Sequence, residues 1–481
     1  MEKSAGAKYG SYLEGKWFSS EEGFEVVDPA TAKPIAKVST VGKAELSRAL
    51  SFAEAARPAW SAMPAKSRGL LLHKVADEVI RRKAEIARTI TLENGKPLAQ
   101  SEGEVGMTED QLRWFAEEGR RAYGRVIPPQ VNGKRHLVVK TPIGVVATIA
   151  PWNFPLALAV RKIAPAMAAG CPVILRPASQ TPLSSVLLAE CMQAAGVPAG
   201  VFQLVIGEAS MISDEFLSNP ICKKISFTGS TRVGQLLIER AAKNIKPLCL
   251  ELGGMAPLLV FEDCDLEIAV RETIIAKFRN SGQSCIAANR IYVQKSIYKK
   301  FMDLFCAAVS KLKTGPGLEP GMDVGPLVNQ GGLDAALAQI ENAVRCGGKV
   351  IAGGNRIKEL PGFFLEPTVI EGMSDDAVCM HEETFAPIAP ISSFDTEAEA
   401  IRRANDTPFG LSAFAMTRDM GRILRLGEQL EAGTVGINDG APTTTNCPFG
   451  GVKQSGWGRE LGTEGLDAFL DTKHVSIGGI E

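Results

Sequence analysis

The spacing of hydrophobic and polar positions changes along the chain, and these changes predict its helices and strands. Apolar residues such as Leu72 and Val75 recur at helical spacing over residues 66–94, which predicts one long amphipathic helix. Another helix is predicted over 43–56. From residue 143 onward, short continuous apolar runs alternate with helical stretches. The predicted strands are 143–149, 172–175, 201–206 and 224–227, and the predicted helices are 157–169, 184–195 and 231–243. This alternation is typical of a parallel sheet with helices on both faces.

The same pattern starts again after Gly253-Gly254 and predicts a second α/β unit. Its predicted strands are 257–261, 290–293, 349–351 and 387–394, and its predicted helices are 264–278, 296–312, 333–346 and 396–405. Two further extended stretches, about 123–141 and 468–478, fit neither unit.

Length and charge agree with a soluble globular protein of two or three domains. The chain has 481 residues, 45% of them hydrophobic and 22% charged, and its net charge is -1. This balance argues against nucleic acid or an acidic membrane as a partner of the whole surface. The start of the chain is polar and predicts no secretory signal. Residues 142–160 carry no charge, but Pro151 and Pro155 interrupt them, so a buried strand and turn is predicted there rather than a membrane span.

Cysteine and histidine usage predicts neither a metal site nor a disulfide framework. The ten cysteines include no Cys-x-x-Cys pair, and the four histidines lie far apart in the sequence. Free thiols at this length indicate a reducing compartment, and we expect a cytoplasmic protein.

Three phrases carry candidate chemistry. Cys285 follows a flexible Ser-Gly-Gln-Ser turn within residues 278–285, Glu251 precedes Gly253-Gly254, and Asn153 lies between Pro151 and Pro155. A nucleophile, a base and a neutral hydrogen-bond donor are the groups that acyl chemistry through a thioester requires. Each also has a simpler interpretation: a buried inert cysteine, a surface glutamate, and a turn asparagine.

The order and spacing of these phrases, together with residues 382–387 (Glu-Glu-Thr-Phe-Ala-Pro) and 448–451 (Pro-Phe-Gly-Gly), resemble the aldehyde dehydrogenase superfamily over nearly the whole chain. The resemblance implies an α/β fold with two Rossmann-like domains and a small β oligomerisation arm. The expected domains are a dinucleotide-binding domain (1–122 and 142–252), a catalytic domain (253–447) and the arm (123–141 and 465–481). It also implies a homo-oligomer, either a dimer or a tetramer.

The resemblance gives the three phrases their roles. Cys285 is expected to attack an aldehyde and to carry first a thiohemiacetal and then a thioester. Asn153 and the Cys285 main-chain N–H would stabilise the oxyanion, and Glu251 would activate the water that releases the acid. Some relatives carry a second cysteine two residues after the first, but this chain has Ala287, so no local redox switch is expected.

A nicotinamide cofactor is implied as well, although no Gly-x-Gly-x-x-Gly follows a strand. Gly229 and Ser230 lie where a strand is predicted to meet a helix, and the resemblance implies that this turn holds the pyrophosphate. A simple helix cap is the alternative. Matching positions assign Trp152, Glu383 and Phe385 to the cofactor site, with Glu383 on the nicotinamide ribose.

The run from Arg176 to Ser179 bears on the choice between NAD and NADP. Arg176 replaces the lysine usual in the family, and Ser179 stands where relatives that prefer NAD often have glutamate. A small neutral residue does not repel a 2′-phosphate, so NADP is favoured over NAD. No metal is expected.

Two arginines point to the substrate. The resemblance is closest to succinate-semialdehyde dehydrogenases, in which arginines at the positions of Arg161 and Arg279 clamp the distal carboxylate of the aldehyde. Thr444 is expected to supply a third contact. A helix-face ion pair and a loop brace are the alternatives for the two arginines. Glutarate or α-ketoglutarate semialdehyde, or a general aldehyde, remain alternative substrates. A CoA-acylating enzyme and a catalytically silent relative are further alternatives, and the presence of Glu251 argues against both.

Overall fold

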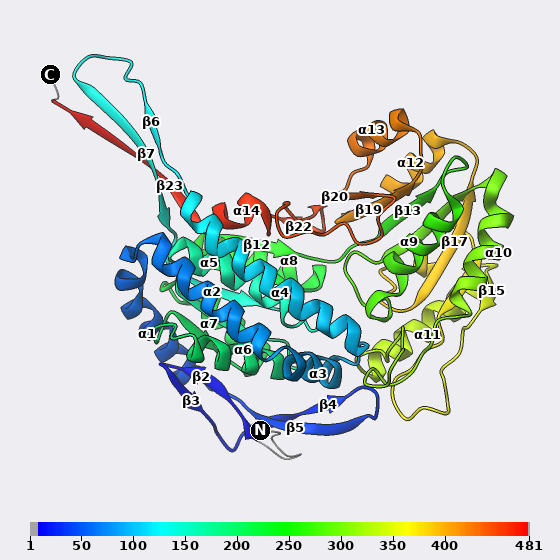
Figure 1. Ribbon diagram of the computed structural model, residues 1–481, viewed down its shortest axis with the longest axis horizontal. Coiled ribbons are helices and arrows are strands. Elements are labelled where there is room, and N and C mark those ends of the chain that lie inside the picture. Colours follow the sequence, from blue (N-terminus) through cyan, green and yellow to red (C-terminus); the bar gives the residue numbers. More distant parts are fainter. Residues whose placement is uncertain (1–7, 480–481) are drawn as a thin grey trace.

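The computed structural model describes residues 8–479, which form two α/β units and a projecting β arm (Figure 1). The first unit is built on an eight-stranded sheet with the order β22-β12-β11-β8-β9-β10-β2-β3. Its strands are β2 (Ser11–Leu13), β3 (Lys16–Phe18), β8 (Val145–Ile149), β9 (Val173–Arg176), β10 (Phe202–Leu204), β11 (Cys222–Thr228), β12 (Leu248–Glu251) and β22 (Gly456–Trp457). The five central strands are parallel, and β2, β3 and β22 add antiparallel edges.

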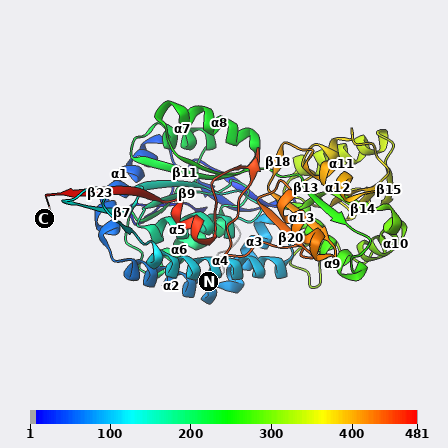
Figure 2. The same ribbon diagram turned by 90° about the horizontal axis from the view of Figure 1, so that it is seen from above.

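Helices cover both faces of this sheet, as Figure 2 shows from above. They are α1 (Lys43–Ala62), α2 (Ala65–Arg81), α3 (Lys83–Asn94), α4 (Leu98–Glu118), α5 (Ala157–Ala169), α6 (Leu183–Ala194), α7 (Ala209–Ser218) and α8 (Thr231–Ala241). Strand β8 explains the continuous apolar run: Val145 and Ala147 pack into the core beneath α1, α7 and α8, while Val146 packs into the core beneath α2 to α6. Because both faces of the strand are buried, no polar residue alternates along it.

The second unit holds a seven-stranded sheet with the order β15-β16-β17-β14-β13-β19-β20, parallel except for the edge strand β15. Its strands are β13 (Ala256–Val260), β14 (Ala288–Gln294), β15 (Lys349–Ala352), β16 (Thr368–Glu371), β17 (Ile388–Phe394), β19 (Ser412–Met416) and β20 (Thr434–Ile437). Its helices are α9 (Leu266–Phe278), α10 (Tyr298–Val309), α11 (Gln330–Arg345), α12 (Glu397–Asn405) and α13 (Met420–Gln429).

The arm joins the two extended stretches that fit neither unit. Strands β6 (Arg125–Ile127), β7 (Lys134–Pro142) and β23 (Leu470–Gly478) form an antiparallel sheet that projects at the upper left of Figure 1. The short helix α14 (Gly462–Asp467) precedes β23. The remaining small strands are β1 (Lys8–Tyr9), β4 (Gly23–Asp28), β5 (Lys33–Ser39), β18 (Phe409–Gly410) and β21 (Val452–Lys453). Subunit pairing through the arm and the expected domain boundaries stay predictions.

One helix prediction was wrong in detail. The single helix predicted over 66–94 is two helices, α2 and α3, because the backbone leaves helical geometry at Arg82 (φ −103°, ψ 16°). The Arg82 guanidinium holds this bend through Glu85 (2.8 Å) and Glu190 on α6 (2.7 Å). The bend lets Ile86 and Val75 enter the same core.

Helix α4 escaped prediction because its buried face is polar. Ser101, Glu104, Thr108 and Gln111 all lie on that face and are all buried. An apolar stripe is the signal that sequence periodicity detects, and this helix has only a broken one. Within residues 8–479, no helix combines the length and the apolar composition needed to cross a membrane.

Candidate catalytic site

Cys285 lies on a strained turn between α9 and β14. Asn280 and Ser281 both adopt left-handed backbone geometry (φ 52° and 56°), which non-glycine residues avoid, and Gly282 follows at φ 72°. A Cβ on Gly282 would collide with the Ala386 carbonyl. The turn therefore needs glycine at position 282. Contacts with the rest of the protein must hold Asn280 and Ser281 in their strained conformation.

Hydrogen bonds to residues outside the turn supply these contacts. The Asn280 N–H donates to Gln100 Oε1 on α4 (2.8 Å), and the Ser281 hydroxyl donates to the Gly325 carbonyl (2.9 Å). The Gln283 side chain donates to the Pro326 carbonyl (3.3 Å). The nucleophile turn is thus fixed from both units.

Asn153 reaches the same turn from the first unit. Its Nδ2 donates to the Gln283 carbonyl (3.2 Å), and its Oδ1 accepts from the Phe154 N–H (3.1 Å). The second contact sets the orientation of the amide, so that the donor nitrogen faces the turn that carries Cys285. An amide in this position can donate to an oxyanion that forms on a substrate bound to the sulfur.

Burial changes the acidity of Cys285, the predicted nucleophile. Desolvation raises the pKa of the Cys285 thiol to about 12; the Glu383 and Glu251 carboxylates add to the rise, and the Arg161 and Arg279 guanidiniums oppose it. The thiol form therefore dominates at neutral pH in the cofactor-free protein. These couplings also place Cys285 in one electrostatic neighbourhood with both acids and both arginines.

Glu251 is the last residue of β12, and its side chain is buried. Neither carboxylate oxygen finds a hydrogen-bond partner among residues 8–479. Desolvation and then the Glu460 carboxylate raise the pKa of Glu251 well above its usual range, against the opposing charge of Lys162. A buried carboxylate with a raised pKa and free lone pairs is suited to accept a proton from water.

A second acid and its partner lie beside this base. The Lys162 ammonium forms an ion pair with Glu460 and donates to Thr228 Oγ1 (2.6 Å). Glu460 Oε2 keeps no hydrogen-bond partner among the described residues and lies 3.9 Å from Arg161 Nε. All of these charged groups are buried.

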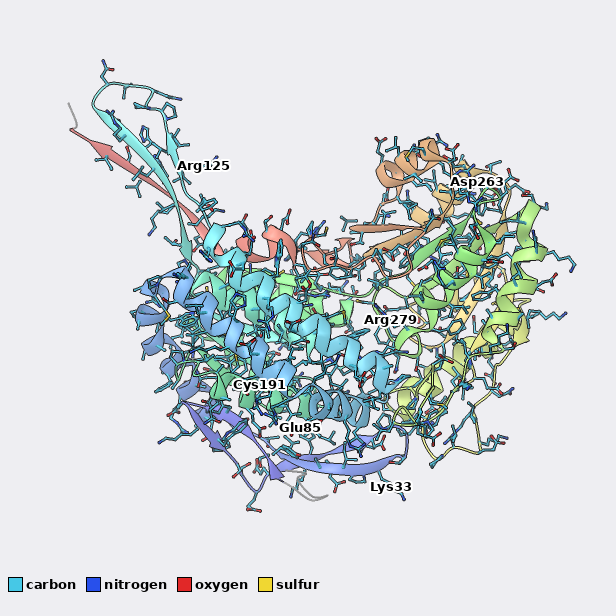
Figure 3. The ribbon with its side chains drawn as sticks, viewed as in Figure 1. Lys33, Glu85, Arg125, Cys191, Asp263 and Arg279 are labelled. Carbon is cyan, nitrogen blue, oxygen red and sulfur yellow. The ribbon has the colours of Figure 1, made fainter. Side chains whose placement is uncertain are left out.

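The two candidate clamp arginines converge on the cluster from different units. Arg161 extends from α5 and covers the Phe449 ring (4.7 Å to the centroid), while Arg279 ends α9 and faces the Phe154 ring (5.4 Å). Burial lowers the pKa of Arg279, and the positive charge of Arg161 contributes to this lowering. Figure 3 shows Arg279 at the junction of the two units. The two guanidiniums thus share one site, and an anion placed there would be stabilised by both.

Thr444 is not joined to the arginines by any hydrogen bond within the described part of the chain. Its side chain is exposed and donates to Asn446 Oδ1 (2.8 Å). Its role in substrate binding stays a prediction.

The predicted cofactor turn joins β11 to α8. Ser230 is the N-cap of α8 and accepts from the Val233 N–H (3.4 Å), and a Cβ on Gly229 would collide with the Phe227 ring. The first-turn N–H groups of α8 offer the positive helix end that a pyrophosphate requires. The geometry therefore fits both the predicted cofactor turn and its alternative, a helix cap.

Arg176 and Ser179 lie together at the carboxyl end of β9. Arg176 Nη2 donates to Ser179 Oγ (3.3 Å), and its Nε has no partner within residues 8–479. Glu208, whose charge acts on Arg176, uses its carboxylate to cap α7 through Ser210 and Met211. An unsatisfied guanidinium donor beside a hydroxyl fits a phosphate group.

Trp152 and Phe385, which were both predicted to contact the cofactor, lie against each other. Their rings meet edge to face with centroids 5.4 Å apart, and Phe385 has a strained backbone (φ 43°). The neighbouring Glu383 accepts from the Gly254 N–H (3.5 Å), and burial raises the pKa of its carboxyl to about 8. A protonated or ionised carboxyl at this place can bond a ribose hydroxyl.

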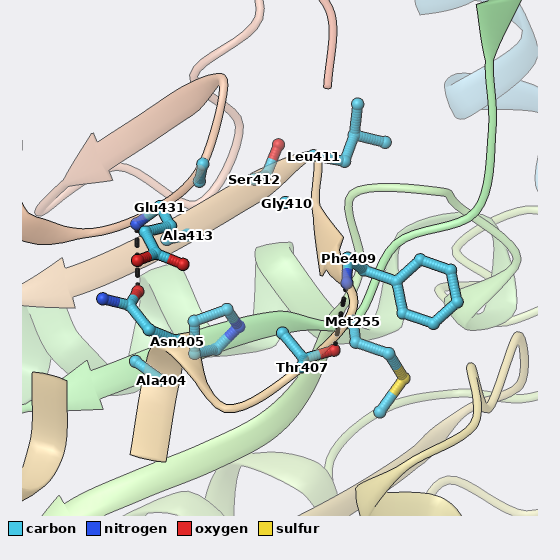
Figure 4. A pocket seen from close by; sticks show the side chains of 12 residues that line it. Met255, Ala404, Asn405, Thr407, Phe409, Gly410, Leu411, Ser412, Ala413 and Glu431 are labelled. Atoms are coloured by element: carbon cyan, nitrogen blue, oxygen red, sulfur yellow. Dashed lines mark hydrogen bonds between the residues drawn. The ribbon is translucent and has the colours of Figure 1, made fainter. Parts of the chain in front are cut away.

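A small cavity in the second unit is separate from this cluster. Figure 4 shows it between residues 404–413 and Glu431, with hydrogen bonds from Phe409 N–H to Thr407 and from Glu431 N–H to Asn405. Its volume is about 10 Å³, which admits at most one water molecule. No cluster of three or more His, Cys, Asp or Glu side chains suited to a metal is found among residues 8–479.

Comparison with known proteins agrees with this geometry. The sequence profile of the aldehyde dehydrogenase family matches residues 17–475. The chain belongs to the aldehyde dehydrogenase family. The resemblance noted from three phrases and the predicted fold and enzyme class are thereby confirmed.

Individual relatives are similar over almost the full chain. The glutarate-semialdehyde dehydrogenase of Pseudomonas aeruginosa is 45% identical over 98% of both chains, and the NADP(+) succinate-semialdehyde dehydrogenase of Escherichia coli is 44% identical over 97% of both. A crystal structure of succinate-semialdehyde dehydrogenase from Burkholderia pseudomallei superposes with a TM-score of 0.96 at 45% identity, covering 98% of each chain.

Several charged residues of the site were missed from the sequence. Lys162 follows Arg161 inside an otherwise apolar helix, and two cations in such a helix are a signal that could have identified it. Glu460 gives no such signal, because a glutamate in a glycine-rich loop is common on surfaces. Lys96 and Glu104 were missed together with the polar face of α4.

Proposed function

We propose that this protein oxidises an aldehyde that carries a distal carboxylate, with succinate semialdehyde as the preferred substrate, to the corresponding dicarboxylic acid. The observation that carries this proposal is the pair Arg161, which is buried, and Arg279, which is half-buried, because both guanidiniums act on the charge of Cys285. Two cations at a fixed distance from a nucleophile select a substrate with an anion at the far end. The relatives named for succinate and glutarate semialdehydes support this choice.

Each residue has a defined part in the reaction. The Cys285 sulfur attacks the carbonyl carbon of the aldehyde, and Asn153 Nδ2 with the Cys285 N–H stabilises the oxygen of the thiohemiacetal. The nicotinamide cofactor, when bound, supplies the hydride acceptor that the oxidation requires. Glu251 then takes a proton from the water that attacks the Cys285 thioester, and the acid is released.

NADP is proposed as the better cofactor. Arg176 and Ser179 form a cationic and hydroxyl pair with an unsatisfied guanidinium donor, which suits a 2′-phosphate. NAD lacks the 2′-phosphate and is therefore expected to be used at lower affinity. Glu208 offsets part of the positive charge of Arg176.

A panel of substrates tests the proposal directly. Reduced-cofactor formation would be followed with succinate, glutarate and α-ketoglutarate semialdehydes and with butanal, each with NADP and with NAD. We expect the highest kcat/KM with succinate semialdehyde and NADP, and the lowest with butanal. A preference for glutarate or α-ketoglutarate semialdehyde would correct the chain length, and equal use of butanal would refute the anion clamp.

The projecting arm supports the proposal of a homo-oligomer, and the ten free cysteines support the proposal of a cytoplasmic location. Val126 on this arm is 75% exposed in the single chain, although it is a large apolar residue, and Ile127 and Ile477 are also exposed. Apolar residues on an antiparallel sheet favour burial against another chain. Sedimentation of the purified protein would distinguish a dimer from a tetramer.

A further inference from the structure

A buried ion pair lies directly behind the loop that carries Asn153. Lys96 follows α3, and its Nζ lies 2.6 Å from Glu104 Oε2 on α4 and donates to the Asn153 carbonyl at 2.7 Å. The side chains of both partners are 0% exposed. A cation and an anion have thus been removed from water together, at the base of the residues 151–155 loop.

The anion of this pair holds the helix that follows the same loop. Glu104 Oε1 accepts from the N–H groups of Leu156 (2.9 Å) and Ala157 (3.2 Å), where α5 begins. A carboxylate at a helix N-terminus satisfies donors that have no partner within the helix. One ion pair therefore fixes both the Asn153 carbonyl and the start of α5.

A second donor reaches the same carbonyl from the nucleophile turn. Asn280 Nδ2 donates to the Asn153 carbonyl at 2.8 Å, so this oxygen is held from two directions. The neighbouring Trp152 carbonyl accepts from Asn94 Nδ2 (3.0 Å). The Lys96 ammonium also lies 3.9 Å from the centre of the Phe154 ring. The backbone on both sides of the Asn153 side chain is thereby fixed.

A buried ion pair of this kind contributes little to the stability of the fold by itself. Replacing a buried ion pair by apolar residues of similar volume is often neutral or stabilising, because desolvation of the charges offsets their attraction. What this pair supplies is a fixed place for one carbonyl and, through it, for the amide that faces Cys285. Catalysis is sensitive to displacements of about 1 Å at such a group.

We infer that Lys96 and Glu104 are positioning residues, which hold Asn153 so that its amide meets the oxyanion formed on Cys285. This inference rests on the proposed oxyanion role of Asn153. The Lys96 ammonium bonds the Glu104 carboxylate and the Asn153 carbonyl, and it makes no hydrogen bond to Cys285. Its effect is transmitted through the Asn153 main chain.

Single-turnover kinetics of Lys96→Met test the inference. With enzyme in excess over succinate semialdehyde, the rate of reduced-cofactor formation is expected to fall about ten- to hundredfold. Alkylation of Cys285 by iodoacetamide develops no oxyanion, so its rate should stay within about twofold. An unchanged single-turnover rate, or an equal fall in both rates, would overturn the inference.

Two further variants keep this result interpretable. Lys246→Met removes another buried lysine, which bonds the Phe216 and Asn219 carbonyls near the opposite end of β12, and it should leave the single-turnover rate unchanged. If Lys96→Met does not fold, the double variant Lys96→Met/Glu104→Leu leaves no unpaired charge, and it should fold and show the same slow single turnover. A double variant with the normal rate would count against the positioning role.

Asn153→Ala separates this inference from the proposed function. If Asn153→Ala leaves the single-turnover rate unchanged, the oxyanion role itself fails. If Asn153→Ala is slow and Lys96→Met is not, only the positioning role fails. When both hold, adding Lys96→Met to Asn153→Ala should cost less than about twofold further, because the two residues act through one group.

Discussion

The carboxylates of Glu251 and Glu460 are both buried, and the negative charge of Glu460 contributes to the raised pKa of Glu251. Lys162 forms its ion pair with Glu460, while both oxygens of Glu251 remain without a hydrogen-bond partner among residues 8–479. Lys162 therefore compensates the charge of Glu460 directly, and Glu251 remains available to bind a proton. This division suits a base that must be neutralised and regenerated in every turnover.

Replacing Glu251 by Gln should separate the two halves of the reaction. The first turnover of reduced cofactor should persist, while steady-state kcat should fall by about 10²- to 10⁴-fold, because general base catalysis is lost. Stopped-flow absorbance with excess aldehyde measures both phases. Unchanged steady-state turnover would remove Glu251 from its proposed role.

The pH dependence of thioester hydrolysis should follow Glu251. A base acts only when deprotonated, so hydrolysis should decline as the pH falls through the raised pKa of Glu251. Glu460→Gln removes a negative neighbour and leaves Lys162 unpaired, and both changes favour the ionised form of Glu251. The acid limb of the steady-state profile should therefore move to lower pH. A limb that stays in place or moves to higher pH would contradict this coupling.

The Cys285 thiol should react slowly in the cofactor-free protein. Because its pKa is raised to about 12, alkylation of Cys285 by iodoacetamide should rise about tenfold per pH unit from pH 7 to 9. Glu383→Gln removes a negative charge that contributes to this rise, and it should speed the reaction mainly above pH 8, where the Glu383 carboxyl is ionised. Peptide mass spectrometry would follow Cys285 separately from the exposed Cys447. A plateau below pH 9 would show that the thiol is more acidic than its burial indicates.

Removing one guanidinium should affect only substrates that carry the distal anion. For Arg279→Leu, we expect kcat/KM for succinate semialdehyde to fall by about 10- to 100-fold, since a hydrogen bond to a charged group contributes about 1.5–3 kcal/mol. The value for butanal should change by less than about threefold. Arg161→Leu should show the same selectivity. An equal loss with both aldehydes would indicate that the arginines brace the loop instead.

Cofactor choice should respond to Ser179. Ser179→Glu places a carboxylate beside Arg176, where it would pair with the guanidinium and repel a 2′-phosphate. We expect KM for NADP to rise on the order of a hundredfold, because like charges in contact cost several kcal/mol, while KM for NAD stays within a few fold. Equal changes for both cofactors would place the 2′-phosphate elsewhere.

Much of the fold was predictable because its central strands are buried on both faces. Residues 157–169 were predicted as a helix with the bounds that α5 has, and every end of β8, β9 and β11 lies within two residues of its prediction. Helix α4 could not be found this way. Its buried side chains include Glu104, whose partners are Lys96 and the first N–H groups of α5. Only the folded chain brings these partners to Glu104.

The order of the residues alone predicted the alternation of strands and helices and the two extended stretches of the arm, and it identified the phrases that contain Cys285, Glu251 and Asn153. These are local patterns, since each depends on neighbours within a few residues. Which charged side chains form pairs depends on the folded arrangement of the chain. Lys162 joins Glu460 across 298 residues, and Lys96 reaches Asn153 across 57, so that burial and pairing set each charge's environment. The electrostatics of a buried cluster depend on distance and exclusion of water, and neither quantity is written in the order of the residues.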